Sequence, residues 1–486
     1  MYEQRIRCKE LRSKIVSPQE AVTLIKDGMN IGTSGGTYTG YPKTVFLALA
    51  DKGKSGEIGG INLWTASLVG EEVDGALCSA GVLKRRLGSH ADRNLRKMIN
   101  SGSVKCFDVR TELLTQLIRT KACGKLDVAV VDAVAITEAG HIVPSNSPVD
   151  IAGLIEAAET VIVEINLMQP SQLEGFHDIY ILSPPPAQRE IPIYYTGDRI
   201  GTTYIPVPKE KIACITVSAI EEKFPPLSEI TKDAKLIAQH LISFLQMEVK
   251  TGRLPPNLLP IESGLGSIAD AVMRQLADAE FHDLEVYTAV LGDGVFELLE
   301  RDVCRVASGT ALYFSKECWN RFCGNMERYR DRLILRPVDV TDHPEVIRRL
   351  GIIALNSAVE ADIYGHINSS HIKGQLLNGI GGSAAFANNG WISIFMLPST
   401  SRRGQGSSIM PMVTHTDHSE HSVDVIVTEQ GIADLRGLCP TERAVCIIEK
   451  CAHPKFRPVL LDYLREAEKM GGHEPHLWDR VFCLLT

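Results

Sequence analysis

The sequence has no uninterrupted apolar run long enough to cross a bilayer, and its first residues, Met1 to Arg7, lack the hydrophobic segment of a signal peptide. We therefore expect a cytoplasmic protein with no membrane partner. An excess of basic residues is also missing, since the formal net charge is -8, and this argues against nucleic acid as a partner. The 12 cysteines include no Cys-x-x-Cys pair, so we expect buried, reduced thiols.

The length and the composition indicate an ordered chain with more than one domain. At 486 residues it exceeds what one ordinary hydrophobic core supports. Hydrophobic residues make up 44% and charged residues 23%, which are values typical of globular proteins and not of disordered ones.

Apolar segments alternate with helical patterns in the first half of the chain, which predicts a parallel sheet covered by helices. Ser17-Pro18-Gln19-Glu20 has the pattern of a capping box and predicts a helix start. A boundary at Phe224-Pro225-Pro226 gives an N-terminal α/β domain, 1–224, and a C-terminal α/β domain, 225–486. Strands are expected at 29–33, 61–68, 126–136, 160–165 and 212–217.

The two halves contain short matching segments in the same order. Trp64-Thr65-Ala66 matches Tyr287-Thr288-Ala289, and the segment 127–142 matches 352–367, with Gly-His-Ile at the end of both. Each half also has a strand that ends in a glycine turn. These matches favour a duplicated α/β domain with a ligand between the halves, at the carboxyl ends of the strands.

The stretch from Leu254 to Gly294 predicts a ligand cradle. It reads as a short strand, a turn at Gly264-Leu265-Gly266, a helix from about Ile268, and a second strand that ends at a Gly292-Asp293-Gly294 turn. Glycines after a strand let main-chain N–H groups approach an anion, and the following helix directs its positive end to the same place.

Four further motifs lie in the second half. The glycines of Asn378 to Ser383 indicate a close backbone approach or positive φ, and Arg402-Arg403 are suited to phosphate. Glu429 stands at the end of a buried-type strand, where ligands bind. The histidines of 415–421 are spaced three apart, but no matching ligand set is evident elsewhere in the sequence, so no metal site is expected.

Several of these segments resemble the acetyl-CoA hydrolase/transferase family, within it most of all the class I CoA-transferases of the succinyl-CoA:acetate and propionyl-CoA:succinate type. The resemblance covers nearly the whole chain and is strongest from Arg253 to about Pro454. It implies two similar open α/β domains with the active site between them, and a homodimer. The segments that carry it are Leu258-Leu259-Pro260, Ser263 to Gly266, Asn378 to Ser383, Asp417 to Ser422 and Val427 to Gly437.

What the resemblance implies is CoA transfer between a short-chain acyl-CoA and a carboxylic acid through a glutamyl-CoA thioester. Coenzyme A is then a substrate, and no permanently bound cofactor is expected. Position 289 matches the family's nucleophile, and Ser67 and Glu429 match positions that line the acyl site. The oxyanion and CoA-binding positions are Gly264, Leu265, Gly266, Gly381, Gly382 and Arg402, and the acid-substrate pocket contains Gly35, Gly36, Thr37 and Asp342.

The sequence departs from the family pattern at two positions. Ala289 stands where the nucleophilic glutamate belongs, and a methyl group cannot attack a thioester. Glu285 lies four residues earlier on a strand, about 13 Å away, which is outside attacking distance. Asp342 stands where related transferases often have asparagine, and a carboxylate there is expected to repel an acid substrate or to change which acid is accepted.

We therefore expect a CoA-transferase scaffold that is inactive or strongly impaired, either by a deliberate Glu-to-Ala replacement or as a natural acyl-CoA-binding paralogue. A hydrolase, in which water replaces the acceptor acid, is an alternative. A nicotinamide-binding oxidoreductase is disfavoured, because Gly264-x-Gly266 lacks the third glycine and the later acidic residue of the dinucleotide fingerprint. The acyl group itself is not determined by the sequence.

Overall fold

The computed structural model describes residues 2–226, 229–401 and 404–481, and it divides into two compact units. The first unit comprises 1–226, 288–291 and 306–346, and the second comprises 227–287, 292–305 and 347–486. The domain boundary expected between residues 224 and 225 stays a prediction, because the first unit also contains segments 288–291 and 306–346, which lie after that boundary. Among the described helices, none combines the length and apolar character that crossing a membrane requires.

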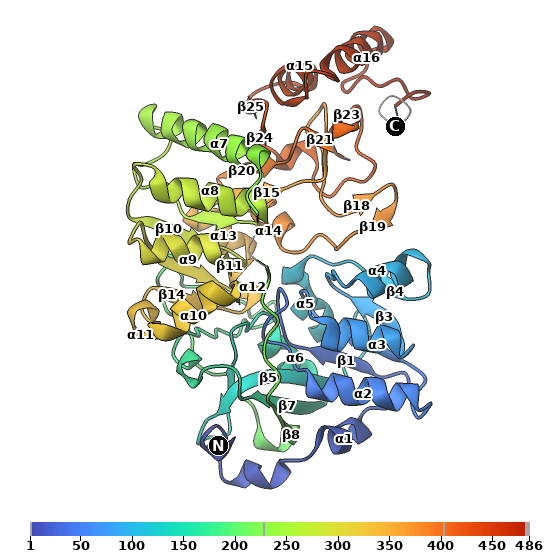
Figure 1. Cartoon of the computed structure of the whole chain (residues 1–486), viewed down its shortest axis with the longest axis vertical. Helices are drawn as coiled ribbons and strands as arrows, with labels where there is room; N and C mark the ends of the chain where they lie inside the picture. Colours follow the sequence, from blue (N-terminus) through green and yellow to red (C-terminus); the bar gives the residue numbers. More distant parts are fainter. Residues whose placement is uncertain (1, 227–228, 402–403, 482–486) are drawn as a thin grey trace. The chain divides into compact units, whose positions relative to one another are not determined.

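The first unit is built on a parallel sheet with strand order β4-β3-β2-β1-β5-β7-β8, to which β6 adds as an antiparallel partner of β5 (Figure 1). Every residue of β5 is buried, as expected for a strand covered on both faces. The strands are β1 (Asn30–Thr33), β2 (Ile61–Trp64), β3 (Leu83–Leu87), β4 (Lys105–Phe107), β5 (Val128–Ile136), β6 (Ile142–Pro144), β7 (Thr160–Asn166) and β8 (Ile212–Ser218).

The helices of the first unit follow the strand-helix alternation that the sequence predicts. The capping box at Ser17 is confirmed, because the Ser17 side chain accepts from the Glu20 N–H and the Glu20 carboxylate accepts from the Ser17 N–H. The helices are α1 (Pro18–Ala21), α2 (Thr44–Lys54), α3 (Ala76–Ser79), α4 (Arg93–Asn100), α5 (Leu114–Arg119), α6 (Ile151–Ala157), α10 (Lys316–Gly324), α11 (Met326–Tyr329) and α12 (Val338–Thr341).

Three later strands also contribute residues to the first unit, but none of them belongs to the sheet described above. Strand β14 (Leu333–Leu335) pairs in parallel with the last three residues of β12 (Cys304–Gly309). The short strand β13 (Ala311–Tyr313) follows Thr310, and the N–H of Leu312 donates to the carbonyl of Asn146 at 3.1 Å.

The second unit repeats the strand order of the first. Its strands run β10-β9-β15-β20-β24, which corresponds to β2-β1-β5-β7-β8, and an antiparallel β25 adds at the edge. Trp64 and Tyr287, which the sequence repeat matches, are the last residues of the corresponding strands β2 and β10. The strands are β9 (Ile261–Ser263), β10 (Leu284–Tyr287), β15 (Ile353–Ser357), β20 (Ile392–Met396), β24 (Val425–Thr428) and β25 (Gly431–Asp434). The duplicated α/β architecture is therefore confirmed.

Helices α7, α8 and α9 lie side by side in the second unit (Figure 1). The long helix expected from Ser228 begins at Lys232, because Thr231 caps it by accepting from the Ala234 N–H. The turn expected at Gly292-Asp293-Gly294 is wrong: a helix starts at Asp293, and Gly294 allows it to approach α8, since a Cβ there would lie 2.5 Å from that of Met273. The bounds are α7 (Lys232–Lys250), α8 (Ser267–Asp278) and α9 (Asp293–Glu300).

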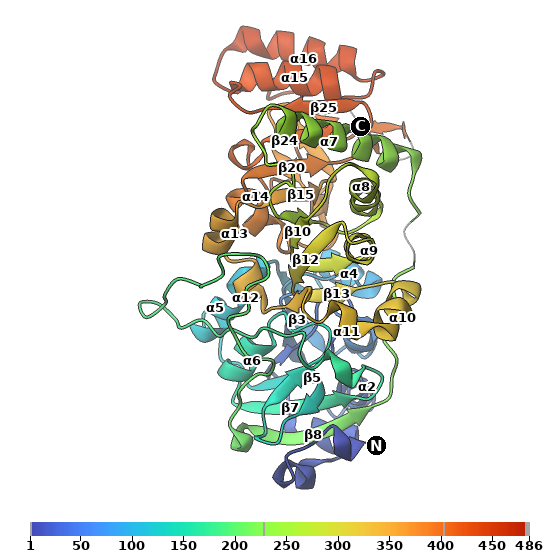
Figure 2. The same ribbon diagram turned by 90° about the vertical axis from the view of Figure 1, so that its left-hand side faces the viewer.

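The last helices pack on each other in the second unit (Figure 2). They are α15 (Pro440–Cys451) and α16 (Arg457–Met470), and α15 also contacts β25. Helix α13 (Pro344–Leu350) precedes β15. The connection between β15 and β20 contains the small strands β16 (Glu360–Asp362), β17 (Ile367–Asn368), β18 (His371–Ile372) and β19 (Gln375–Leu376), followed by α14 (Ser383–Asn389). Three more pieces follow β20, namely β21 (Thr400–Ser401), β22 (Gly406–Ser407) and β23 (Ile409–Met410).

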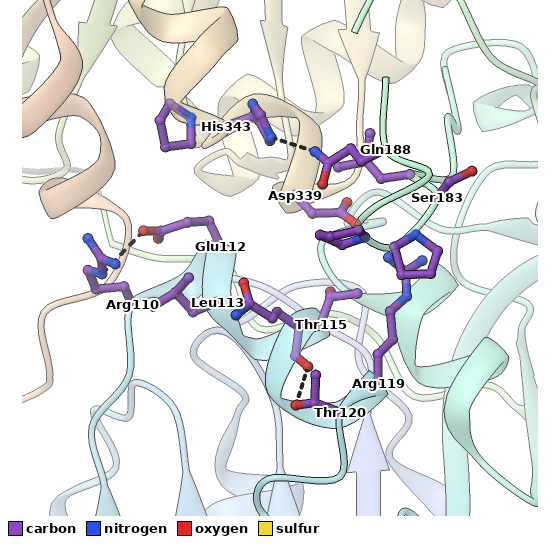
Figure 3. A pocket seen from close by; sticks show the side chains of 15 residues that line it. Arg110, Glu112, Leu113, Thr115, Arg119, Thr120, Ser183, Gln188, Asp339 and His343 are labelled. Atoms are coloured by element: carbon purple, nitrogen blue, oxygen red, sulfur yellow. Dashed lines mark hydrogen bonds and ion pairs between the residues drawn. The ribbon is translucent and has the colours of Figure 1, made fainter. Parts of the chain in front are cut away.

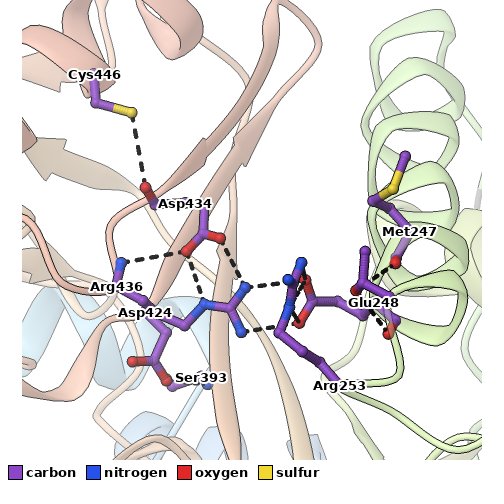
Figure 4. Close-up of polar contacts among 9 residues, drawn as sticks. Met247, Glu248, Arg253, Ser393, Asp424, Asp434, Arg436 and Cys446 are labelled. Atoms are coloured by element: carbon purple, nitrogen blue, oxygen red, sulfur yellow. Dashed lines mark hydrogen bonds and ion pairs between the residues drawn. The ribbon is translucent and has the colours of Figure 1, made fainter.

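A buried carboxylate fixes α7 to the end of β25 (Figure 4). The Glu248 side chain is 1% exposed and accepts from Arg253 Nε at 2.9 Å and from Arg436 Nη1 at 3.0 Å. Arg436 also donates to Asp434 at 2.7 Å. Burial raises the pKa of Glu248, but the hydrogen bonds from the two guanidinium groups outweigh it and lower the pKa to about 2.

Candidate active site

A strained turn follows β1 in the first unit. Gly35 has φ 125°, and a Cβ on Gly36 would lie 2.4 Å from Val149 Cγ2. Thr37 and Tyr38 come next with φ values of 53° and 66°, which side chains other than glycine rarely adopt. Two such residues in succession store strain of the kind that clusters at functional sites.

Ser67 lies against this turn at the end of β2. Its hydroxyl accepts from the Thr37 N–H at 3.3 Å, and the Tyr38 N–H donates to the Leu68 carbonyl at 3.0 Å. The structure therefore brings together four of the residues predicted for the site, namely Gly35, Gly36, Thr37 and Ser67.

Ala289 belongs to the same unit and lies just after β10. It is partly exposed, and its carbonyl accepts from Thr310 twice, from the N–H at 2.9 Å and from the hydroxyl at 2.6 Å. Ala311 follows Thr310 in the sequence, and its methyl group lies 3.6 Å from the position that a Cβ on Gly36 would occupy. Thr310 and Ala311 thus connect position 289 with the glycine turn after β1.

A second glycine turn follows β9 in the second unit. The Gly264 N–H donates to the Leu355 carbonyl at 3.0 Å, so this donor is already used within the sheet. Gly266 has φ 107° and is the N-cap of α8, where no side chain caps the helix. A Cβ on Gly266 would meet nothing within 4 Å, so the positive end of α8 faces open space.

Glu429 follows β24, at the same edge of the second unit's parallel sheet. Its carboxylate accepts from the Ser399 N–H at 2.7 Å, from the Ser399 hydroxyl, and from Gln430 Nε2 at 3.0 Å. Burial raises the pKa of Glu429, but these hydrogen bonds outweigh it and hold the pKa below the usual value. Glu429 is therefore a fixed carboxylate that is ionised at neutral pH.

The glycine-rich loop leads into α14. Gly379 and Gly381 have φ values of 118° and 60°, which explains the need for glycine, and Gly382 is the N-cap of α14. The Ser383 hydroxyl lies 3.2 Å from Nε2 of His418, whose burial lowers its pKa to about 4. Arg402, predicted to bind CoA, lies outside the described residues.

Comparison with known proteins identifies the chain. The acetyl-CoA hydrolase/transferase N-terminal domain matches residues 1–217, and the C-terminal domain of the same family matches 319–464. The sequence is 44% identical to succinyl-CoA:acetate CoA-transferase of Clostridium kluyveri over 100% of this chain and 90% of that protein. The chain belongs to the acetyl-CoA hydrolase/transferase family.

Another member of the family is also similar to the chain, and one solved structure shares its fold. The acetyl-CoA hydrolase of Schizosaccharomyces pombe is 39% identical over 98% of this chain and 95% of its own length. The crystal structure of RipA from Yersinia pestis has the same fold, with a TM-score of 0.74 at 20% identity over 95% of this chain and 98% of that chain. Both enzyme types in this family act on acyl-CoA thioesters, so membership makes this chain a CoA-transferase or hydrolase scaffold.

Asp342, predicted for the acid-substrate pocket, is fully buried in this family member. Its carboxyl accepts from the Thr111 hydroxyl at 2.7 Å, and its other oxygen has no hydrogen-bond partner. Burial and the nearby Glu112 raise the pKa of Asp342 to about 8. At neutral pH the group is therefore mostly protonated and uncharged, like an asparagine, so charge repulsion of an acid substrate is not expected from it.

A cavity of about 270 Å³ in the first unit is lined by Asp339 and His343, which lie close to Asp342 in the sequence (Figure 3). Burial raises the pKa of both Glu112 and Asp339, the latter to about 6, and His343 lies 3.0 Å from the Gln188 amide. None of the site residues predicted from the sequence is among its lining side chains. They are Arg110, Glu112, Leu113, Thr115, Gln116, Arg119, Thr120, Leu182, Ser183, Pro184, Pro185, Gln188, Asp339, His343 and Pro344.

Three positions close to predicted residues of their own unit were not themselves predicted from the sequence. Thr310 holds the carbonyl of residue 289, and Tyr38 shares the strained turn with Thr37. Glu262 is buried on β9, and its carboxylate accepts from the Leu355 N–H at 2.9 Å and from Asn356 Nδ2 at 3.2 Å. A sequence signal existed only for Glu262, a carboxylate directly before the Ser263-Gly264 turn.

Proposed function

We propose that this protein has the site of a CoA-transferase that moves CoA between a short-chain acyl-CoA and a carboxylic acid, and that Ala289 leaves this copy without its nucleophile. Support comes from the 44% identity with a CoA-transferase over the whole chain and from the setting of position 289. That position lies at a strand end and is partly exposed, and it is linked through Thr310 and Ala311 to the turn that contains Gly36 and Thr37.

A glutamate at position 289 supplies the covalent chemistry in this proposal. One carboxylate oxygen attacks the thioester carbonyl, the C–S bond breaks, and CoA leaves as a thiolate with a mixed anhydride formed. The thiolate then attacks the glutamyl carbonyl and releases the first acid, giving a glutamyl-CoA thioester. A second carboxylate attacks that thioester, and the same two steps in reverse give the new acyl-CoA.

Three other glutamates of the chain are not available to replace it. Glu285 is ion-paired with Arg305, with Nε of the guanidinium at 2.9 Å. Glu262 is held by the N–H of Leu355, and Glu429 is held by Ser399. Each carboxylate is committed to partners of its own, which supports the inactivity of this chain.

The other predicted residues have supporting roles. Main-chain N–H groups of Leu265 and Gly266 stabilise the oxyanion in this proposal, since the Gly264 N–H is engaged by Leu355. Such a donor is worth roughly 3 kcal/mol of transition-state stabilisation. Ser67 orients the acyl group, and the Glu429 carboxylate fixes the segment that contains Ser399.

The deciding experiment restores the carboxylate with Ala289→Glu, and Ala289→Gln is the matched control of equal size. Both variants are incubated with acetyl-, propionyl- and succinyl-CoA, and the intact protein is weighed by mass spectrometry. Only Ala289→Glu should gain the mass of a CoA thioester, and hydroxylamine should remove it. An inactive Ala289→Glu variant that still binds CoA would instead favour an acyl-CoA-binding protein.

Hydrolysis is the second candidate, because the chain is also 39% identical to an acetyl-CoA hydrolase. In that case water resolves the glutamyl thioester and no acceptor acid is needed. Loss of acetyl-CoA by Ala289→Glu should be measured with and without added acetate, propionate or succinate. An acid-dependent rate with formation of the new acyl-CoA supports the transferase, and an acid-independent rate supports the hydrolase. The proposal includes a homodimer, which sedimentation equilibrium tests.

A further inference from the structure

Two histidines and an aspartate converge on one point in the second unit. His371 begins β18, and His415 and Asp417 lie in the segment after β23. One ligand atom from each of the three side chains lies within 4.8 Å of the other two. The two imidazole rings approach to 3.8 Å between centroids, with an angle of 36° between their planes.

The carboxylate of this cluster is buried and rigidly held. The Asp417 side chain is 3% exposed and accepts from the Ser369 N–H at 2.6 Å, from the Ser370 N–H at 2.9 Å and from the Ser370 hydroxyl at 2.7 Å. Its Oδ1 lies 3.2 Å from Nε2 of His415. A buried carboxylate fixed from behind and directed at an imidazole is a pre-organised pair of ligands.

Ser370 also orients the second histidine. Its hydroxyl lies 2.7 Å from Nδ1 of His371, which leaves Nε2 of that ring for a ligand bond. Metal-binding histidines usually have such a hydrogen bond on the nitrogen that does not bind the metal. The His415 side chain is 42% exposed, so an ion and a water molecule can reach the cluster from solvent.

We propose that His371, His415 and Asp417 bind one divalent transition-metal ion, with Zn²⁺ as the best match. Two imidazoles and one carboxylate are typical zinc ligands, with the fourth position open to water. Tetrahedral coordination at bond lengths of about 2.1 Å requires ligand atoms roughly 3.4 Å apart.

The ion would connect two segments of the second unit. His371 belongs to the β18–β19 hairpin, and the Leu377 N–H, just after that hairpin, donates to the Ser370 carbonyl at 2.8 Å. The glycine-rich loop that ends at Ser383 follows directly. The ion therefore fixes the hairpin to the segment of His415 and Asp417, and it takes no part in the acyl-transfer steps.

The sequence alone does not lead to this site, and no metal was expected from it. Of the evenly spaced histidines at 415, 418 and 421, only His415 belongs to the cluster. His418 is buried beside Phe395 and Ser383, and His421 is paired with Glu420 on the surface. The partner that completes the set, His371, comes from a distant hairpin that only the fold brings close.

A second group of possible ligands provides an internal comparison. His366, Glu420 and Glu474 also lie within 4.8 Å of one another, but both ring nitrogens of His366 already have carboxylate partners. Nε2 lies 2.8 Å from Glu420, and Nδ1 lies 3.2 Å from Asp362. This arrangement is satisfied without an ion, so the metal is assigned to the His371 cluster only.

The test uses the full chain without a purification tag, treated with a chelator and dialysed. Titration with ZnCl2 in a calorimeter and with CoCl2 by visible absorption should show one equivalent and the strong ligand-field bands of tetrahedral Co²⁺. His371→Ala and His415→Ala should each weaken binding at least tenfold, and Zn²⁺ should raise the melting temperature of the unaltered protein but not of these variants. His421→Ala and His366→Ala are the matched controls and should bind as the unaltered protein does.

Two results would overturn the assignment. One is equal Zn²⁺ binding by the unaltered protein and by the His371→Ala/His415→Ala double variant. The other is loss of binding in His366→Ala with retention in the double variant, which would move the ion to the other cluster. Melting curves in the presence of chelator show whether each variant is folded, and because binding is measured without substrate, the outcome does not depend on the proposed acyl transfer.

Discussion

The carbonyl of Ala289 accepts two hydrogen bonds from Thr310, one from the N–H at 2.9 Å and one from the hydroxyl at 2.6 Å. Both donors come from the residue that precedes β13, so the backbone at position 289 is fixed from one side. A nucleophile attached to this backbone has its Cα position determined before any substrate binds, which is how a covalent site is pre-organised.

Replacing Thr310 by valine tests this relationship. In the Ala289→Glu background, Thr310→Val keeps the side-chain shape and the N–H donor but removes the hydroxyl donor, so kcat should fall about tenfold, corresponding to roughly 1.4 kcal/mol. Steady-state kinetics with one acyl-CoA measure it. Thr251→Val, which removes an exposed hydroxyl bonded to the Met247 carbonyl, is the control and should change kcat less than twofold. A similar loss in both variants would contradict the role of Thr310.

Gly36→Ala should destabilise the protein by about 1–3 kcal/mol, because the new Cβ would lie 2.4 Å from Val149 Cγ2 and the turn must move. Urea unfolding followed by circular dichroism measures it. Gly324→Ala is the control, since a Cβ there meets nothing within 4 Å. Val149→Ala in the same chain should recover part of the loss, and failure of this rescue would point to a cause other than the contact.

Asp342→Asn should change how stability depends on pH. The folded pKa of about 8 lies above the ordinary aspartate value. The stability that the protonated Asp342 contributes is therefore present in full below about pH 4 and is lost as the pH rises through 8. Asparagine does not titrate. The variant should therefore gain stability relative to the unaltered protein from about pH 4 upward, by at most about 1.4 kcal/mol per pH unit, and the gain should level off above pH 8.

Urea unfolding of both proteins at pH 5, 7 and 9 checks this. A difference between them that stays constant over the three values would show that Asp342 is ionised throughout. The Thr111 hydroxyl is a hydrogen-bond donor to either side chain, so the fold itself is expected to tolerate the exchange.

Glu248→Gln should destabilise the second unit by roughly 2 kcal/mol at pH 7, because two guanidinium groups lose a buried carboxylate. The folded pKa of Glu248, about 2, lies below the usual glutamate value. The stability that its carboxylate contributes is therefore present above about pH 4.5 and is lost as the pH falls through 2. Thermal unfolding should show the two proteins converging in acid. Glu327→Gln, in an exposed pair with Arg330, is the control and should cost less than about 0.5 kcal/mol.

Much of the architecture was predictable, because continuous apolar strands such as Val128–Ile136 and the capping box at Ser17 are local signals. The repeat of Trp64-Thr65-Ala66 in Tyr287-Thr288-Ala289 also gave the correct strand correspondence. The helix start at Asp293 was missed, since a Gly-Asp-Gly sequence reads as a turn until the close approach of α8 is known.

For the site, the sequence indicated residues whose type suggests a chemical role. It did not indicate residues that matter only through their position in the fold. Ser67 and Thr37, which the family resemblance assigned to the site, are hydrogen-bonded to each other. Thr310 could not be found, because an ordinary threonine becomes relevant only through a hydrogen bond to a residue on another strand. The buried, protonated state of Asp342 depends on Thr111 and Glu112, which are remote in sequence.

The first compact unit includes residues 288–291 and 306–346 as well as the N-terminal segment. During synthesis on the ribosome, proteins usually complete their leading domain before the rest emerges. Here that order is interrupted, because the first unit needs residues up to 346, and segments 227–287 and 292–305 of the second unit are translated before them. The sheet of the first unit has all its strands once β8 ends at Ser218, whereas the segment with Ala289 joins the unit only later in synthesis.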